Sequence, residues 1–191
     1  ETQEITGLSW QKDASWGDYK VTRVKDTPSV NLADAFAYSD NIYFAREALE
    51  MGREVYEAGL ANYVFGEDLK LPIAMNPAQI SNSGTLDSEG QLADTAFGQG
   101  ELLLNLIQQA VTYTPFANEG NLVYPKLTAD QETAEPKQVV SPESAAIIKE
   151  DLVQTVQKEY GSSHKLAVID QKTAAKTGTA ETRESETEGE D

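Results

Sequence analysis

Residues 31–49, NLADAFAYSDNIYFAREAL, decide the helical part of the fold. Apolar side chains recur at three- and four-residue spacings on both sides of Ser39-Asp40-Asn41, and this is the period of one helix face. Ser, Asp and Asn are preferred helix N-caps because their side-chain oxygens accept unpaired backbone N–H groups. The stretch therefore predicts two helices that meet at this tripeptide, the second of which ends at Gly52.

The same periodicity predicts the remaining elements. Residues 1–30 show no sustained helical period and are expected to be extended or irregular. Further helices are predicted over Val55–Phe65, from Leu102 to Asn118 with a kink at Pro115, and from Ser141 to Gly161, with a long irregular stretch between Gly66 and Gly90. Residues 166–180, rich in Val, Ile, Thr and Ala, indicate a strand. We expect it over 172–181, in an antiparallel sheet flanked by helices, so the fold class is α+β.

Composition excludes several classes of function. The 191 residues hold 32 acids and 15 Lys plus Arg, and the formal charge of −17 repels the phosphates of nucleic acids. The absence of Cys removes disulfides, thiol nucleophiles and Cys-ligated metals, and one His, His164, leaves no His-rich metal site. No cofactor, metal or nucleic-acid partner is expected, and proton transfer must use groups other than histidine.

The ends of the chain suggest a piece of a longer protein. It begins without Met, shows neither a signal peptide nor an apolar stretch of membrane-spanning length, and finishes in the acidic residues 181–191. We therefore expect a soluble, truncated chain with an acidic and disordered end.

Two short patterns carry the chemistry. Ser39-Asp40-Asn41 lies between two helices, and Lys176-Thr177-Gly178 lies on the predicted strand. Taken singly, the first fits an ordinary helix cap and the second fits a strand end turning into a loop. If the two form one site, Ser39 and Asn41 should lie near Lys176, and the Ser39 hydroxyl and the Lys176 amine should come within hydrogen-bond or one-water distance, roughly 3–5 Å.

Together the two patterns match two of the three signatures of the serine acyl-transferases that act on D-Ala-D-Ala peptides and β-lactams. The chain closely resembles the transpeptidase domain of class B penicillin-binding proteins, most closely the low-affinity, resistance-associated type of Gram-positive bacteria. The resemblance runs along nearly the whole chain, through the stretches Ser15–Arg23, Ser39–Arg46, Asn76–Asn82, Phe97–Glu101 and Lys176–Glu181. It implies that residues 31–180 are a partial transpeptidase domain, that 1–30 lead into it, and that 181–191 are a loop between two strands.

The resemblance also implies roles for individual residues. Ser39 would relay a proton toward the leaving amine, Asn41 would bind the substrate backbone, and Lys176 would be the second cation beside the catalytic lysine. Thr177, Gly178 and Thr179 would bind the substrate, with the terminal carboxylate gripped by the two threonines and Lys176. The backbone N–H of Thr179 would form half of the oxyanion hole.

The nucleophile of the family belongs to a Ser-x-x-Lys signature that normally precedes Ser-x-Asn, and we expect it before Glu1. Two such patterns occur in the chain, Ser9–Lys12 and Ser162–Lys165. Ser9 is too close to Ser39 and lies in an irregular segment, whereas Ser162 follows the second signature instead of preceding it. We reject both, so the chain alone is expected to be inactive.

The implied whole protein cross-links peptidoglycan stem peptides through a serine acyl-enzyme at the extracytoplasmic face of the membrane, and binds β-lactams. Other cell-wall synthesis proteins are possible binding partners of the whole protein. Two other classes remain as alternatives: a non-catalytic protein that holds peptidoglycan or a cell-division partner, and a β-lactam sensor domain. The presence of Ser-x-x-Lys upstream would separate the enzyme from the non-catalytic protein.

Overall fold

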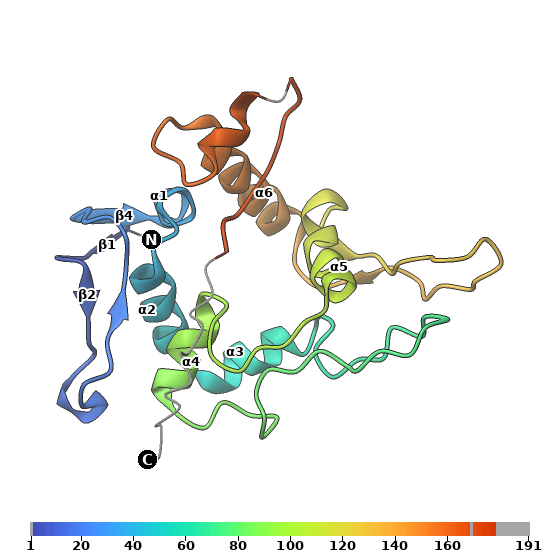
Figure 1. Cartoon of the computed structure of the whole chain (residues 1–191), viewed down its shortest axis with the longest axis horizontal. Coiled ribbons are helices and arrows are strands. Elements are labelled where there is room, and N and C mark those ends of the chain that lie inside the picture. Colours follow the sequence, from blue (N-terminus) through green and yellow to red (C-terminus); the bar gives the residue numbers. More distant parts are fainter. Residues whose placement is uncertain (1, 169, 179–191) are drawn as a thin grey trace, which may run out of the picture.

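The computed structural model describes residues 2–168 and 170–178. Over these residues the fold is α+β, as predicted, with six α-helices and three antiparallel pairs of short strands (Figure 1). The amino-terminal segment pairs β1 (Thr2–Glu4) with β4 (Ser29–Asn31) and β2 (Ser9–Trp10) with β3 (Val21–Thr22). A third pair joins β5 (Asn121–Leu122) to β6 (Lys137–Gln138).

The predicted pair of helices around residue 40 is confirmed. α1 (Leu32–Tyr38) and α2 (Asn41–Met51) are separated only by Ser39 and Asp40. The Asp40 carboxylate accepts the backbone N–H of Tyr43 at 3.1 Å, which makes Asp40 the N-cap of α2. Gly52 ends α2, as the sequence indicates.

The other helices match the predictions less closely at their ends. α3 (Arg53–Leu60) stops before Phe65, and α4 (Glu89–Ala96) was not predicted. α5 (Leu106–Ala117) begins after Leu102 because Asn105 and Gln108 form a reciprocal capping box that fixes the start at Leu106. α6 (Pro142–Gln157) begins at the predicted proline but ends before Gly161. Two short 3₁₀ turns cover Ala14–Trp16 and His164–Val168.

The strand predicted over residues 172–181 is wrong for its described part, because residues 172–178 form no strand. A strand needs a neighbouring strand to take its backbone hydrogen bonds. Here the N–H of Ala175 donates to the carbonyl of Leu152 at 3.1 Å, and the carbonyl of Ala175 accepts the Thr155 hydroxyl at 2.6 Å. Helix α6 therefore holds the backbone groups that a sheet would use. Residues 179–181 lie outside the described residues.

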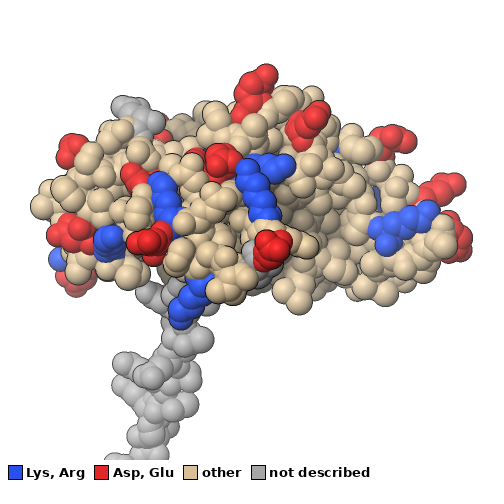
Figure 2. Space-filling view, turned by 90° about the horizontal axis from the view of Figure 1, so that it is seen from above, with Lys and Arg blue, Asp and Glu red and all other residues tan. Residues whose placement is uncertain are grey.

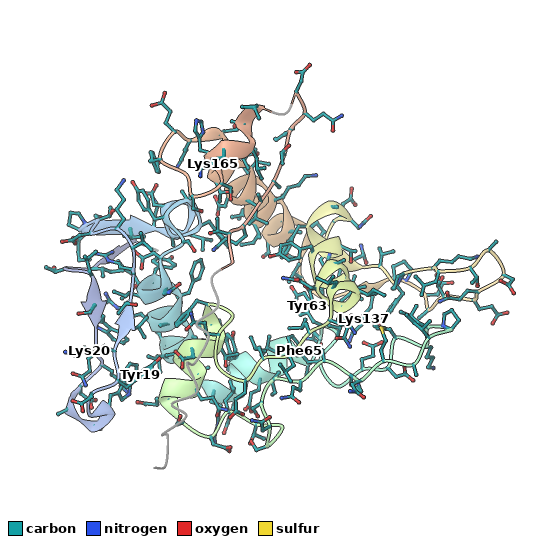
Figure 3. The ribbon with its side chains drawn as sticks, in the orientation of Figure 1. Tyr19, Lys20, Tyr63, Phe65, Lys137 and Lys165 are labelled. Carbon is teal, nitrogen blue, oxygen red and sulfur yellow. The ribbon has the colours of Figure 1, made fainter. Side chains whose placement is uncertain are left out.

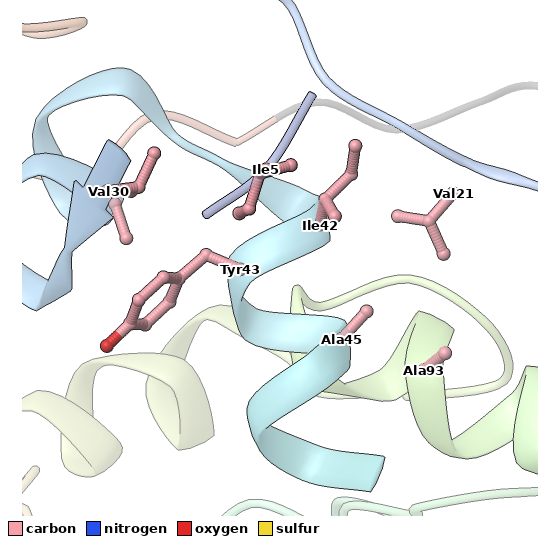
Figure 4. Close-up of a cluster of buried hydrophobic side chains, with 8 residues drawn as sticks. Ile5, Val21, Val30, Ile42, Tyr43, Ala45 and Ala93 are labelled. Carbon is pink, nitrogen blue, oxygen red and sulfur yellow. The ribbon is translucent and has the colours of Figure 1, made fainter. Parts of the chain in front are cut away.

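The largest hydrophobic cluster joins the amino-terminal strands to α2 and α4. Ile42, Tyr43 and Ala45 of α2 are buried against Ile5, Val21, Val30 and Ala93 (Figure 4). Burial of such side chains contributes about 1.5–3 kcal/mol for each large apolar residue. Residues 1–30 are therefore part of the same packed body as the Ser39 junction.

A second cluster forms around α5. Val64, Leu69, Ala78, Val111 and Leu122 are buried together, and Tyr63 and Phe65 pack against them near α5 (Figure 3). Through this cluster the long irregular segment after α3 gains a hydrophobic anchor. None of the described helices combines the length and apolar character that crossing a bilayer requires.

A buried ion pair joins the amino-terminal strands to the α1–α2 junction. Nη1 of Arg23 lies 2.8 Å from Oδ2 of Asp40, and both side chains are only 1% exposed. The other guanidinium hydrogen bonds go to the backbone carbonyls of Ile5, Gly7 and Thr27 and to the Asp26 carboxylate. Every N–H of Arg23 is thus used, which offsets the cost of burying its charge.

We predict that Arg23→Met lowers the free energy of unfolding by about 3–5 kcal/mol, because it leaves the Asp40 carboxylate buried and unpaired. Chemical denaturation of the chain measures the change. The double variant Arg23→Met/Asp40→Asn is the control, since it removes both charges and keeps a side-chain oxygen at the N-cap of α2. The double variant should recover part of the loss, and no recovery would contradict a charge-based origin.

Candidate active site

Ser39 occupies a backbone conformation that few residues adopt. Its φ of 56° and ψ of 53° are left-handed helical, and it closes α1 with its N–H on the carbonyls of Ala35 and Phe36. Such a conformation costs a non-glycine residue roughly 1–2 kcal/mol. A serine stands here where glycine would fit the backbone better, which points to a use for its hydroxyl.

The hydroxyl of Ser39 meets the side chain of Lys176. Nζ of Lys176 donates to Oγ of Ser39 at 2.6 Å, although the two residues are 137 positions apart in sequence. The same ammonium donates to the carbonyl of Thr177 at 3.0 Å. The predicted proximity of Ser39 and Lys176 is therefore confirmed.

Burial changes the acidity of this lysine. Desolvation lowers the pKa of Lys176 from its ordinary value of 10.5, because the partly buried site disfavours the charged form. A lysine whose pKa is lowered releases its proton more readily, and the nearest acceptor of its hydrogen bond is Ser39. The structure thus joins an amine and a hydroxyl in one hydrogen bond that involves no histidine.

The neighbours of this pair are placed as follows. Asn41 is the first residue of α2, partly exposed and two residues beyond Ser39. Thr177 is exposed, and its hydroxyl donates to Oγ of Ser162 at 3.3 Å. A Cβ added at Gly178 would meet nothing within 4 Å among the described residues, so open space adjoins this glycine. Thr179 lies outside the described residues, as does the acidic stretch 181–191.

The two Ser-x-x-Lys patterns that the sequence analysis rejected lie in different places. Ser9 pairs with Thr22 in the β2–β3 ladder, and Lys12 forms an ion pair with Glu89. Ser162, in contrast, lies at the site, beside Thr177. The sequence analysis missed this proximity because the order of motifs along the chain does not show which segment the turn after α6 contacts.

A pocket of about 1280 Å³ lies apart from these residues, between the amino-terminal segment and α4. Its lining includes Trp16, Tyr19, Asp94 and Gly98–Leu102, and it does not include Ser39 or Lys176.

Within the described ranges, no group of three or more His, Asp or Glu residues could hold a metal ion.

Comparison with known families identifies the family of this chain. The family model described as the penicillin binding protein transpeptidase domain matches residues 1–191. The chain belongs to this family. The match covers both Ser39-Asp40-Asn41 and Lys176-Thr177-Gly178, so the contact between them lies inside the transpeptidase domain.

Two curated relatives share much of the sequence. Penicillin-binding protein 3 of Bacillus subtilis is 43% identical over 189 residues, which cover 97% of this chain and 28% of that protein. Peptidoglycan D,D-transpeptidase PbpA of Mycolicibacterium smegmatis is 30% identical over 165 residues, which cover 81% of this chain and 33% of that protein. The chain therefore spans about a third or less of the length of each relative.

We predict that Ser39→Gly is more stable than Ser39→Ala by about 1 kcal/mol. Both variants lose the hydroxyl, but only glycine adopts the left-handed conformation without steric cost. Thermal and chemical denaturation compare the two. Equal stability would show that the backbone at residue 39 relaxes when the hydroxyl is removed.

We predict that the Lys176 amine titrates below 10.5 when followed by NMR of its Cε carbon. Because the folded pKa is below the unfolded pKa, the unfolded chain holds more protons between the two values, and stability should rise with pH across that interval. Lys176→Met identifies the signal and should abolish this contribution. Titration at or above 10.5 would contradict burial of the amine.

Proposed function

We propose that this chain is the part of a serine-type D-Ala-D-Ala transpeptidase that carries its second and third signatures. The observation that supports the proposal is the 2.6 Å contact between Lys176 and Ser39 in a chain of the penicillin-binding protein transpeptidase family. One relative is named a peptidoglycan D,D-transpeptidase, which agrees with this reaction. We further place the protein in class B, in the low-affinity type, on the resemblance of its motifs.

In the proposed reaction, the oxygen of a serine outside these 191 residues forms a bond to the carbonyl carbon of the penultimate D-Ala. The proton of that serine passes to the lysine of the same Ser-x-x-Lys signature, which the neighbouring cation Lys176 keeps neutral enough to act as base. The C–N bond to the terminal D-Ala then breaks, and Ser39 relays the proton to the leaving amine. The acyl group then passes to an amine of a neighbouring stem peptide. A β-lactam imitates the donor peptide and leaves a stable acyl-enzyme.

The remaining residues bind the donor. Asn41 hydrogen-bonds its backbone carbonyl, while Lys176 and the hydroxyls of Thr177 and Thr179 hold its terminal carboxylate. Gly178 lets the peptide lie close to the chain, in agreement with the open space around it. The Thr179 N–H contributes half of the oxyanion hole.

The setting follows from the same proposal. The whole protein acts on peptidoglycan at the extracytoplasmic face of the membrane, and residues 31–180 are its partial transpeptidase domain, with 1–30 leading in and 181–191 connecting two strands. On the face shown in Figure 2, basic side chains lie scattered among acidic ones. This distribution, together with the net charge of −17, is unlike that of a nucleic-acid-binding surface.

We predict that a fluorescent penicillin leaves no covalent adduct on the 191-residue chain and labels the longer protein that carries it with a Ser-x-x-Lys signature. In the longer protein, Lys176→Ala should slow acylation by about two to four powers of ten, since it removes carboxylate attraction and the charge that tunes the catalytic lysine. Stopped-flow labelling and mass spectrometry measure both results.

Lys172→Ala is the matched control, because Lys172 lies in the same segment but pairs at the surface with Glu150. It should acylate at the wild-type rate. A β-lactam-sized mass on Ser9 or Ser162 of the chain would contradict an external nucleophile. A longer protein that is never acylated would favour the non-catalytic alternative.

A further inference from the structure

The turn that follows α6 brings a serine to the site that neither signature contains. Ser162 is exposed, and its Oγ lies 3.3 Å from Oγ1 of Thr177. Thr177 in turn directly follows Lys176, whose amine contacts Ser39. The hydroxyl pair of Ser162 and Thr177 therefore lies one residue along the chain from the lysine that contacts Ser39.

The position of Ser162 is fixed by its backbone. Its N–H donates to the carbonyl of Ala37 at 2.7 Å, two residues before Ser39. This short hydrogen bond ties the turn to the end of α1. The Ser162 hydroxyl takes no part in that bond and stays available to a ligand.

The turn is also fitted tightly against α6. A Cβ added at Gly161 would lie 2.1 Å from the carbonyl oxygen of Thr155, so only glycine fits at this approach. The same carbonyl accepts the N–H of Ser163 at 3.2 Å. Thr155 is fully buried, and its hydroxyl holds the carbonyl of Ala175 at 2.6 Å.

Thr155 thus holds two segments at once: the turn that carries Ser162 and the segment that carries Lys176 and Thr177. One buried residue of α6 thus anchors the backbone of both segments, in addition to the hydrogen bond of Ser162 to Ala37 and that of Ala175 to Leu152. Such pre-positioning lowers the entropic cost of binding a ligand between them.

We propose that Ser162 is a carboxylate-binding residue, which donates its hydroxyl to the terminal carboxylate of the donor peptide or β-lactam beside Thr177 and Lys176. A carboxylate accepts several hydrogen bonds, and two hydroxyls 3.3 Å apart can both donate to it. On ligand binding, the Thr177 hydroxyl turns from Ser162 to the carboxylate. The inference rests on the proposed function and adds a residue to its substrate site.

The test compares ligands with and without the carboxylate. In the longer protein, Ser162→Ala should weaken the binding step of a penicillin about tenfold and leave the binding of its methyl ester unchanged, because only the acid offers a charged acceptor. Ser162→Thr keeps a hydroxyl at an exposed position and should restore binding of the acid. Equal losses for acid and ester, or no loss for either, would overturn the inference.

A second measurement works on the 191-residue chain without acylation. NMR titration with N-acetyl-D-Ala-D-Ala should shift the amide signals of Ser162 and Thr177, and the carboxamide form of the same dipeptide should shift them much less. Ser162→Ala should weaken the acid about tenfold. If the longer protein is never acylated but this difference is found, the proposed reaction fails and the carboxylate site stands; if the acid and the carboxamide bind alike, the site fails.

Discussion

The ion pair between Arg23 and Asp40 is the constraint on which the site depends. Both side chains are buried, and the guanidinium also donates hydrogen bonds to three backbone carbonyls of the amino-terminal segment. Asp40 uses its other oxygen to cap α2. One carboxylate therefore fixes the segment before the helices, the start of α2 and the break at which Ser39 is presented.

To lie between the two helices, Ser39 must adopt a left-handed backbone conformation, which is unfavourable for a residue other than glycine. The chain must leave α1 and restart as α2 within two residues, and the capping by Asp40 stabilises that restart. The outcome is a hydroxyl placed at a helix end and aimed at a segment from the far end of the chain. A continuous helix would instead have left Ser39 on the helix surface, without the turn that presents it.

The second half of the site is built differently. Residues 172–178 are irregular and obtain their position from α6, through hydrogen bonds of Ala175 with Leu152 and Thr155. Lys176 directly follows Ala175, so these hydrogen bonds fix the backbone immediately before the lysine. The two signatures therefore lie on different kinds of structure, one at the junction of two helices and the other on an irregular segment.

The sequence by itself determined the helix break at Ser39-Asp40-Asn41, the cap at Ser141-Pro142 and the pairing of two signatures, because each depends on local side-chain chemistry or on motif order. Periodicity also predicted most helices, although it did not predict α4 or the start of α5. The Asn105–Gln108 capping box determines where α5 begins. Only the tertiary structure decided that Arg23 is the partner of Asp40, that α6 replaces a strand as the partner of Ala175, and that Ser162 lies beside Thr177. These contacts join residues 15 or more positions apart, and their partners are chosen by packing and by the need to satisfy buried polar groups, which no local pattern encodes.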